Sequence, residues 1–228
     1  MFTGFTEKTG AFLWDLAFNN ERSWFLAHKQ EFEDFVNTPF KALAADAFEQ
    51  LNARFPDFEG RLHISRIYRD ARRLFGRGPY KDHLWFSIKP GAVLLEGPMF
   101  WFEFGASDYA YGMGFYSATP AQMAAFRKGL DANPARFLRL ARALERKGWE
   151  VDGEPYKRPR ALHGDPLLDA WYNRKWVGLE RRFDLGGPAF TDALPGVLVD
   201  AWTELMPMYE YLMEAYLSCP EEMGRGRT

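Results

Sequence analysis

The stretch MFWFEFG at residues 99–105 restricts the possible folds of this chain more than any other segment. Alternate side chains of a strand point to opposite faces, so one face would carry three phenylalanines: Phe100, Phe102 and Phe104. Such a face predicts a strand that is buried against a core. The short connection GASD (105–108) then leads into YAYGMGFYS (109–117), and HLWFSIK (83–89) precedes both. We therefore expect a meander of antiparallel strands in the middle of the chain.

Helical patterns flank this predicted meander on both sides. Before residue 56, apolar residues recur at the spacing of one helix face in three segments: 6–18, 21–35 and 38–51. We expect Asn20 to cap the second of these helices and Thr38 to cap the third. After residue 118, Thr119-Pro120 and Asp165-Pro166 are typical helix starts. The fold class predicted is α+β, with a central antiparallel β meander packed by N-terminal and C-terminal helices. We expect one domain over residues 1–217 and a flexible C-terminal tail over 218–228.

The overall composition limits the classes of partner. The 228 residues carry a formal net charge of −2, which argues against a protein that coats nucleic acid through its whole surface. The single cysteine, Cys219, permits neither an internal disulfide nor a thiolate metal cluster. No segment approaches the roughly 20 apolar residues that span a bilayer, and the first residues lack a signal-peptide pattern. We expect a cytoplasmic protein with no membrane partner.

Positive charge is concentrated in RIYRDARRLFGRGPYK, residues 66–81. This run holds six basic residues and the single acid Asp70, a local charge of +5 in a nearly neutral chain. Arginine pairs bidentately with phosphate or carboxylate, and Gly76 and Gly78 could adopt positive φ and turn backbone N–H groups toward an anion. The stretch predicts binding of an anionic small molecule, with these ligand-binding candidates: Arg66, Arg69, Arg72, Arg77, Tyr80 and Lys81.

Two other interpretations of the basic stretch stay open. The arginines could form an internal network of ion pairs, in which Asp70 bridges Arg69 or Arg72, and the chain would then be a structural or interaction protein. They could also contact nucleic acid, which we favour less. The local structure is ambiguous as well, because residues 62–75 fit either a helix or a strand. We prefer a strand through about Tyr68, followed by a basic loop.

The sequence names no reaction, so it leaves open whether the chain is an enzyme. The candidates for proton transfer are Asp70 and His83, the latter directly after the basic stretch. None of the four histidines has a metal-ligand spacing, and no serine lies in G-x-S-x-G. We therefore predict no metal and no cofactor. The segment KRPR (157–160) could add to the basic surface or form a solvated loop of its own.

Two segments, RIYRDARRLFGRGPYKDH and NNERSWFLAHKQEFE, resemble a widespread, mostly bacterial family that is catalogued as a domain of unknown function. Its signature, R-I-x-R-D-x-R-F-x-x-D-K-x-P-Y-K, follows an N-N-x-x-x-W-F opening, and the positions of this chain that match it include Arg66, Arg69, Asp70, Arg72, Pro79, Tyr80 and Lys81. The chain departs from the signature at Arg73, Gly76 and Arg77, where the family has Phe, Asp and Lys. The similarity extends to GMGFYSATP, Arg127 and KRPR. It implies a single α+β domain with a shared site at this stretch, and it brings no activity with it.

Overall fold

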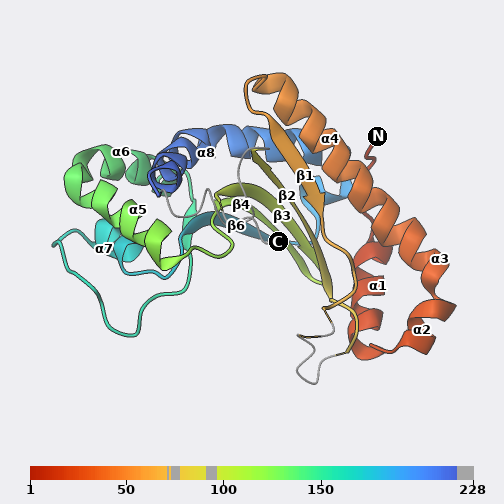
Figure 1. Ribbon diagram of the computed structural model, residues 1–228. Coiled ribbons are helices and arrows are strands. Elements are labelled where there is room, and N and C mark those ends of the chain that lie inside the picture. Colours follow the sequence, from red (N-terminus) through yellow and green to blue (C-terminus); the bar gives the residue numbers. More distant parts are fainter. Residues whose placement is uncertain (71, 73–77, 91–96, 220–228) are drawn as a thin grey trace, which may run out of the picture. The chain divides into compact units, whose positions relative to one another are not determined.

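The computed structural model describes residues 1–70, 72, 78–90 and 97–219 (Figure 1). The chain divides into two compact units, each made of several segments. Unit 1 comprises Met1–Ile88, Trp101–Tyr111 and Arg182–Asp200, and unit 2 comprises Lys89–Phe100, Gly112–Arg181 and Ala201–Thr228. The single domain expected over 1–217 stays a prediction. The expected tail over 218–228 lies outside the described residues beyond Cys219.

An antiparallel sheet forms the centre of the fold, with the strand order β1-β2-β3-β4-β6-β5. Its strands are β1 (Gly60–Ile64), β2 (His83–Pro90), β3 (Met99–Gly105), β4 (Asp108–Gly114), β5 (Glu150–Asp152) and β6 (Gly178–Asp184). The first four strands follow one another in sequence and in space, which confirms the predicted meander. The fold class is therefore α+β with a central antiparallel sheet, as the sequence predicts.

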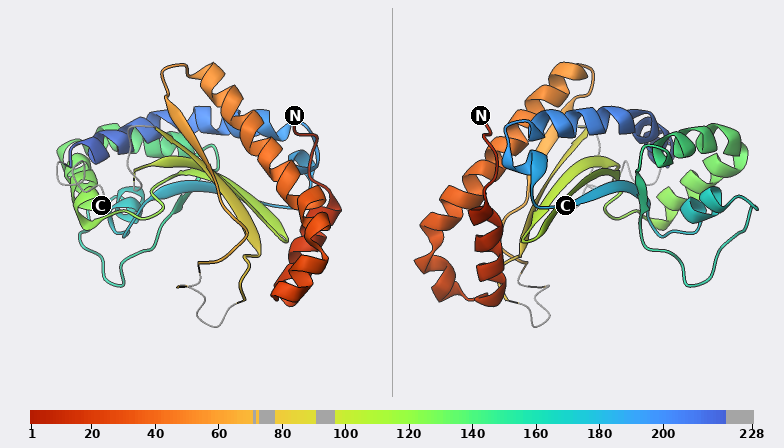
Figure 2. Two further views of the ribbon diagram at one scale, coloured as in Figure 1. Left: turned by 45° about the vertical axis from the view of Figure 1, so that its right-hand side comes forward. Right: turned by 180° about the vertical axis from the view of Figure 1, so that it is seen from behind.

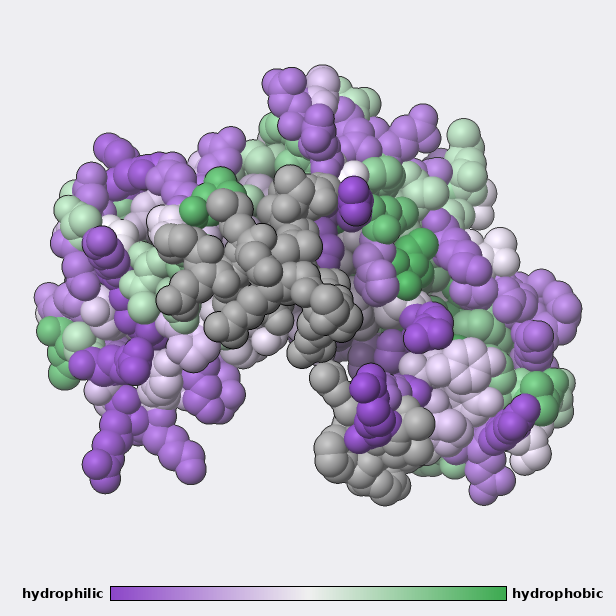
Figure 3. All heavy atoms as spheres, viewed as in Figure 1, coloured by the Kyte–Doolittle hydropathy of each residue, from purple (hydrophilic) through white to green (hydrophobic). Residues whose placement is uncertain are grey.

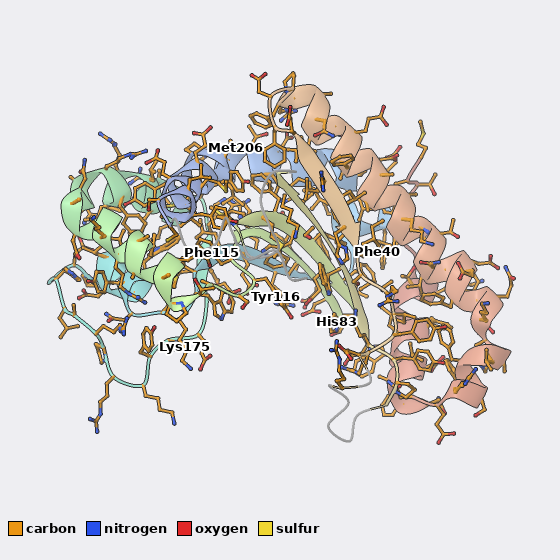
Figure 4. All side chains as sticks on the ribbon, in the orientation of Figure 1. Phe40, His83, Phe115, Tyr116, Lys175 and Met206 are labelled. Carbon is orange, nitrogen blue, oxygen red and sulfur yellow. The ribbon has the colours of Figure 1, made fainter. Side chains whose placement is uncertain are left out.

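Phe100 belongs to unit 2, where its ring lies against Trp202 and Tyr209. Helices of unit 1 pack against the phenylalanine face at Phe102. They are α1 (Glu7–Phe18), α2 (Arg22–Ala27), α3 (Lys29–Phe32), the π-helical turn η1 (Glu33–Asn37) and α4 (Thr38–Arg54). Figure 1 shows α4 running beside β1. The buried ring of Phe40 on α4 lies 5.7 Å from Phe86 on β2 and 6.0 Å from Phe102 on β3, measured between ring centroids (labelled in Figure 4). Aromatic burial thus joins helix and sheet.

Thr38 does not cap a new helix, contrary to the prediction. Its φ of −65° and ψ of −52° are helical, because the chain passes from α3 through η1 into α4 without leaving the helix. The π turn frees the carbonyl of Phe35, and the buried Thr9 hydroxyl on α1 donates to that oxygen at 2.8 Å. Because the helix is continuous at Thr38, no cap is needed there, and the Thr9 hydroxyl instead provides a donor for the Phe35 carbonyl in the π turn.

Helices of unit 2 follow the sequence signals closely. They are α5 (Pro120–Ala132), α6 (Pro134–Glu145), α7 (Pro166–Tyr172) and the part of α8 (Leu194–Leu217) that begins at Ala201; η3 (Gly187–Phe190) belongs to unit 1. Thr119 and Gln122 form a reciprocal capping box at the start of α5, and Asp165 caps α7. Figure 2 shows α5, α6 and α7 as one group, and Trp171 and Phe137 meet in its core at 5.2 Å.

Gly114 lies where two backbone segments of unit 2 approach each other closely. Its φ is +147°, and a Cβ atom there would lie 2.4 Å from the Cα of Gly178 and 2.6 Å from the carbonyl oxygen of Val177. No side chain fits in that space. Glycine is therefore required where β4 passes the start of β6.

Candidate functional site

The basic stretch folds as the two arms of a hairpin. The N–H of Arg69 donates to the carbonyl of Pro79, and the N–H of Lys81 donates to the carbonyl of Ile67, both at 2.8 Å. These bonds make an antiparallel bridge between Tyr68 and Tyr80. β1 ends at Ile64, and residues 65–70 form no helix but an irregular segment with one isolated bridge at Tyr68. The predicted strand is therefore present only as far as Ile64, and the bridge at Tyr68 brings the two ends of the basic stretch together.

The hairpin is anchored on the helices of unit 1 through Tyr80. The Tyr80 side chain is 2% exposed, and its ring stacks on Phe25 of α2 at 4.2 Å between centroids. Burial, followed by the effect of Tyr68, raises the pKa of the Tyr80 hydroxyl. Since Phe25 covers one face of the ring, Tyr80 serves here as an anchor, whereas the neighbouring Tyr68 is 53% exposed. The sequence did not single out Tyr68 as a residue of the site.

Asn20 holds the backbone of Tyr80 from both sides. Its Nδ2 donates to the Tyr80 carbonyl at 3.0 Å, and its Oδ1 accepts from the Tyr80 N–H at 2.9 Å. The predicted capping role of Asn20 is wrong, because Glu21 occupies the N-cap position of α2. Gly76 lies outside the described residues, whereas Gly78 packs closely against Asn20. Its role is spatial, since a Cβ there would lie 2.2 Å from Oδ1 of Asn20.

Arg69 points into this anchor. Its Nε donates to the Tyr80 carbonyl at 2.6 Å, and its Nη2 lies 3.6 Å from Oδ1 of Asp82. The Arg69 side chain is only 15% exposed. Asp82 was not among the residues predicted from the sequence, although it directly follows Lys81. Arg69 therefore belongs in part to an internal network, as one of the alternative interpretations proposed.

Asp70 pairs with Arg72 and not with Arg69. The Arg72 Nη2 and Nε donate to the two Asp70 carboxylate oxygens at 2.8 and 3.1 Å, and the Arg72 N–H also donates to Oδ1 at 3.0 Å. The hydrogen bond and charge of Asp70 raise the pKa of Arg72. The Arg72 side chain is 88% exposed, so this pair contributes little stability, but it does neutralise the Arg72 charge locally.

The positive charges of Arg66 and Lys81 are compensated less by carboxylates than those of Arg69 and Arg72. Lys81 Nζ donates to the backbone carbonyl of Arg66 at 2.6 Å. The pKa of Lys81 is lowered, first by burial and then by the positive charges of Arg69 and Arg66. In the described part of the chain, no carboxylate forms an ion pair with either Arg66 or Lys81. We call Arg66, Arg69 and Lys81 the basic corner.

His83 opens β2 beside the basic corner, where Figure 4 labels it. Its Nδ1 lies 2.9 Å from Oδ1 of Asp82, and its side chain is 34% exposed. Burial acts to raise the pKa of Asp82, but hydrogen bonds from His83 and the backbone, with the charges of His83 and Arg69, lower it overall. Asp82 thus links the proton-transfer candidate His83 to Arg69. Figure 3 shows strongly hydrophilic side chains at this end of the β1–β2 pair.

The structure thus brings together most of the predicted site residues. Arg66, Arg69 and Lys81 meet at the base of the hairpin, whereas Asp70 and Arg72 form a separate exposed pair. Arg77 lies outside the described residues. KRPR belongs to unit 2.

Two further observations concern metals and membranes. Among the residues with described positions, no group of three histidine, cysteine, aspartate or glutamate side chains is placed to hold a metal ion. Within the same residues, no helix combines the length and the apolar character that a membrane crossing requires.

Comparison with known proteins supports the resemblance that the two sequence segments carry. A search of curated proteins gives no match. A family model described as a conserved hypothetical protein (DUF2461) matches residues 8–211, which include α1, the anchor residue Asn20, the whole hairpin and most of α8. The chain therefore belongs to the DUF2461 family of conserved hypothetical proteins.

Proposed function

We propose that this protein binds an anionic small molecule, bearing phosphate or carboxylate, at the basic corner. The observation that carries the proposal is the position of Lys81, whose Nζ donates to the backbone carbonyl of Arg66 at 2.6 Å. Burial lowers the pKa of Lys81, and repulsion by the positive charges of Arg69 and Arg66 lowers it further. Among the described residues, the carboxylate that pairs with the corner is that of Asp82, and it already contacts both Arg69 and His83. An oxyanion bound between Arg66 and Lys81 would remove this repulsion and form charge-assisted hydrogen bonds.

The residues of the corner divide the work of such binding. Arg66 is exposed, and its guanidinium is available for a bidentate contact. Lys81 adds a second positive charge from the opposite arm of the hairpin. Arg69 holds the Tyr80 backbone carbonyl in place. It also contributes the part of its positive charge that Asp82 does not compensate. The exposed ring of Tyr68 lies between Arg66 and Arg69 in sequence and offers a surface for a flat ligand.

A thermal-shift titration with orthophosphate, citrate and a nucleoside monophosphate tests the proposal. A ligand present at 100 times its Kd stabilises the native state by about 2.7 kcal/mol, which is readily measured as a rise in Tm. Arg66→Ala should abolish the rise without changing the Tm of the unliganded protein. Arg61→Ala is the matched control, because Arg61 is an exposed arginine on β1, roughly 16 Å along an extended chain from Arg66.

The same titration separates the proposal from its alternatives. If no anion raises the Tm, or if Arg66→Ala and Arg61→Ala respond alike, the corner does not bind a small anion. The ion pairs of Arg69 and Arg72 are what the structural alternative expects. A negative titration would therefore leave an internal ion-pair network as the explanation of the basic stretch. Binding of single-stranded oligonucleotide that weakens steeply with salt would instead indicate a nucleic-acid contact.

We also infer a cytoplasmic location. Its support is the single cysteine, which allows no internal disulfide and suits a reducing compartment. Fractionation of cells that express the full chain checks this inference, and recovery in a secreted or membrane fraction would contradict it.

A further inference from the structure

A second arginine, Arg127 of α5, is buried in unit 2, and no carboxylate in the described part of the chain pairs with it. The residue as a whole is 5% exposed. Its Nε donates to the carbonyl of Tyr172 at 2.9 Å, and its Nη2 donates to the carbonyl of Arg174 at 2.7 Å. Its Nη1 is buried and, among the described residues, has no hydrogen-bond partner. A buried charge of this kind is normally paired.

A second guanidinium lies against the same aromatic ring. The Cζ atom of Arg127 lies 5.5 Å from the ring centroid of Tyr156, and the Cζ atom of Arg160 lies 4.9 Å from it. Arg127 also lies 5.7 Å from the ring of Tyr172. Aromatic rings attract cations, but they carry no net charge. Two positive charges therefore converge on Tyr156, and within the described residues neither guanidinium forms an ion pair with a carboxylate.

Two acids near Tyr172 are already engaged by His163. Asp169 lies 2.9 Å from His163 Nδ1, and Asp131 lies 3.5 Å from His163 Nε2 and accepts from the Tyr172 hydroxyl at 3.3 Å. Burial and Asp131 raise the pKa of Tyr172, while Arg127 and Arg160 act in the opposite direction. Both guanidinium groups thus act on the Tyr172 hydroxyl from nearby, although in the part of the chain described neither forms an ion pair with Asp131 or Asp169.

The segment that carries Arg160 is a long irregular connection. Residues 153–165 join β5 to α7 without a helix or strand (Figure 1). Lys157 and Arg158 on this connection are exposed, and Figure 3 shows strongly hydrophilic side chains extending where Figure 1 shows the connection. Because Tyr156 and Arg160 lie over Arg127, displacement of this connection would open a path to the buried Nη1 atom.

We infer that unit 2 contains an oxyanion site of its own, in which a phosphate or carboxylate group binds between Nη1 of Arg127 and the guanidinium of Arg160. The two hydrogen bonds from Arg127 to backbone carbonyls fix its fork, and the connection carrying Tyr156 and Arg160 closes over the ligand. This inference rests on Arg127 and Arg160 alone and is independent of the basic corner. The shared ligand chemistry is a negatively charged oxygen pair.

Titration of an Arg66→Ala protein tests this site with the basic corner already disabled. Sodium orthophosphate, sodium acetate and sodium chloride at matched ionic strength are added in separate experiments. Each experiment measures two quantities, the Tm and the NMR signals of the arginine Nε–Hε groups. We expect orthophosphate or acetate, but not chloride, to raise Tm and shift the Arg127 signal. The salt that gives the response identifies phosphate or carboxylate as the ligand group.

Two further variants in the Arg66→Ala background locate the effect. Arg160→Ala should weaken the apparent anion affinity about tenfold or more, the loss expected for one charge-assisted hydrogen bond. Arg158→Ala, an exposed arginine two residues away, is the control and should retain full affinity. Equal responses of these two variants, an unchanged Arg127 signal, or a Tm rise in chloride alone would overturn the inference. Because the Arg160 side chain is exposed, its removal leaves the folded protein available for measurement.

Discussion

A Gly78→Ala substitution tests how the two segments of the family signature are held together. The added Cβ would lie 2.2 Å from Oδ1 and 2.6 Å from Cβ of Asn20, so the Asn20 side chain has to leave its position. It would then lose both hydrogen bonds with the Tyr80 backbone. A net hydrogen bond is worth about 1 kcal/mol, and an unsatisfied buried group costs about 1–3 kcal/mol. We expect Gly78→Ala to lower the free energy of unfolding by about 2–4 kcal/mol.

A double-mutant cycle shows whether Asn20 is the cause. Asn20→Gly removes every atom that the new Cβ would approach most closely. Alone it should cost about 2–3 kcal/mol, from the same hydrogen bonds and from added backbone freedom. In that background, Gly78→Ala should cost less than about 1 kcal/mol. The two substitutions should therefore be coupled by about 2–3 kcal/mol.

Urea unfolding followed by tryptophan fluorescence measures all four proteins, with a shared m-value as the condition for comparing them. Gly196→Ala in α8 is the matched control, because a Cβ there lies 3.9 Å from its nearest neighbour, Gln50 Oε1, and alanine favours a helix. Strictly additive costs for Asn20→Gly and Gly78→Ala would refute the reasoning. So would a Gly78→Ala protein as stable as the Gly196→Ala control.

Three other predictions concern hydrogen bonding and protonation. Thr9→Val should lower the free energy of unfolding by about 1–3 kcal/mol, because the Phe35 carbonyl in the π turn loses its donor; urea unfolding measures it, and no change would mean that another donor replaces Thr9. Asp82 has a lowered pKa in the folded state, so its carboxylate stabilises the fold above its unfolded pKa, and this contribution is lost as pH falls through the folded pKa. The stability difference between the wild type and Asp82→Asn should therefore begin to shrink as pH falls below about 4 and vanish once pH is below the folded pKa of Asp82, and a difference that persists in strong acid would contradict this origin. Lys81 should take up protons when orthophosphate binds at alkaline pH, because the anion reverses the lowering of its pKa. Calorimetry in two buffers of different ionisation enthalpy measures that uptake, and an undiminished uptake in Lys81→Arg would assign it to another group.

The sequence predicts those parts of the fold that depend on neighbours within a few residues. Thr119 and Gln122 form their capping box within one helical turn, and alternation in 99–105 defines a strand and its buried face. Asn20 was misread because its partner, Tyr80, is distant in sequence. Thr38 was misread for a similar reason, since the Thr9 hydroxyl stabilises the π turn before it from another helix.

The segment that carries the candidate site was predictable from the sequence, but the pairing of its charged side chains was not. The density of arginine in 66–81 located it, and alternation through Tyr68 indicated extended structure. Which acid pairs with which arginine depends on the hairpin register, which brings Lys81 back beside Arg66 and Asp82 within reach of Arg69. No local spacing contains that register. The sequence therefore favoured Asp70 as the central acid, whereas Asp82 compensates Arg69.

The pairing separates the residues of the basic stretch that hold the structure of the corner from those that could bind a ligand there. Arg69 is three-quarters or more buried and holds the Tyr80 carbonyl, so Arg69→Ala would unfold the anchor and weaken any ligand at the same time. Loss of binding in that variant could not distinguish a ligand contact from a structural one. Arg66 carries the opposite combination of an exposed guanidinium and no ion pair in the described chain. Substitution of Arg66 is therefore the change that separates anion binding from an internal ion-pair network.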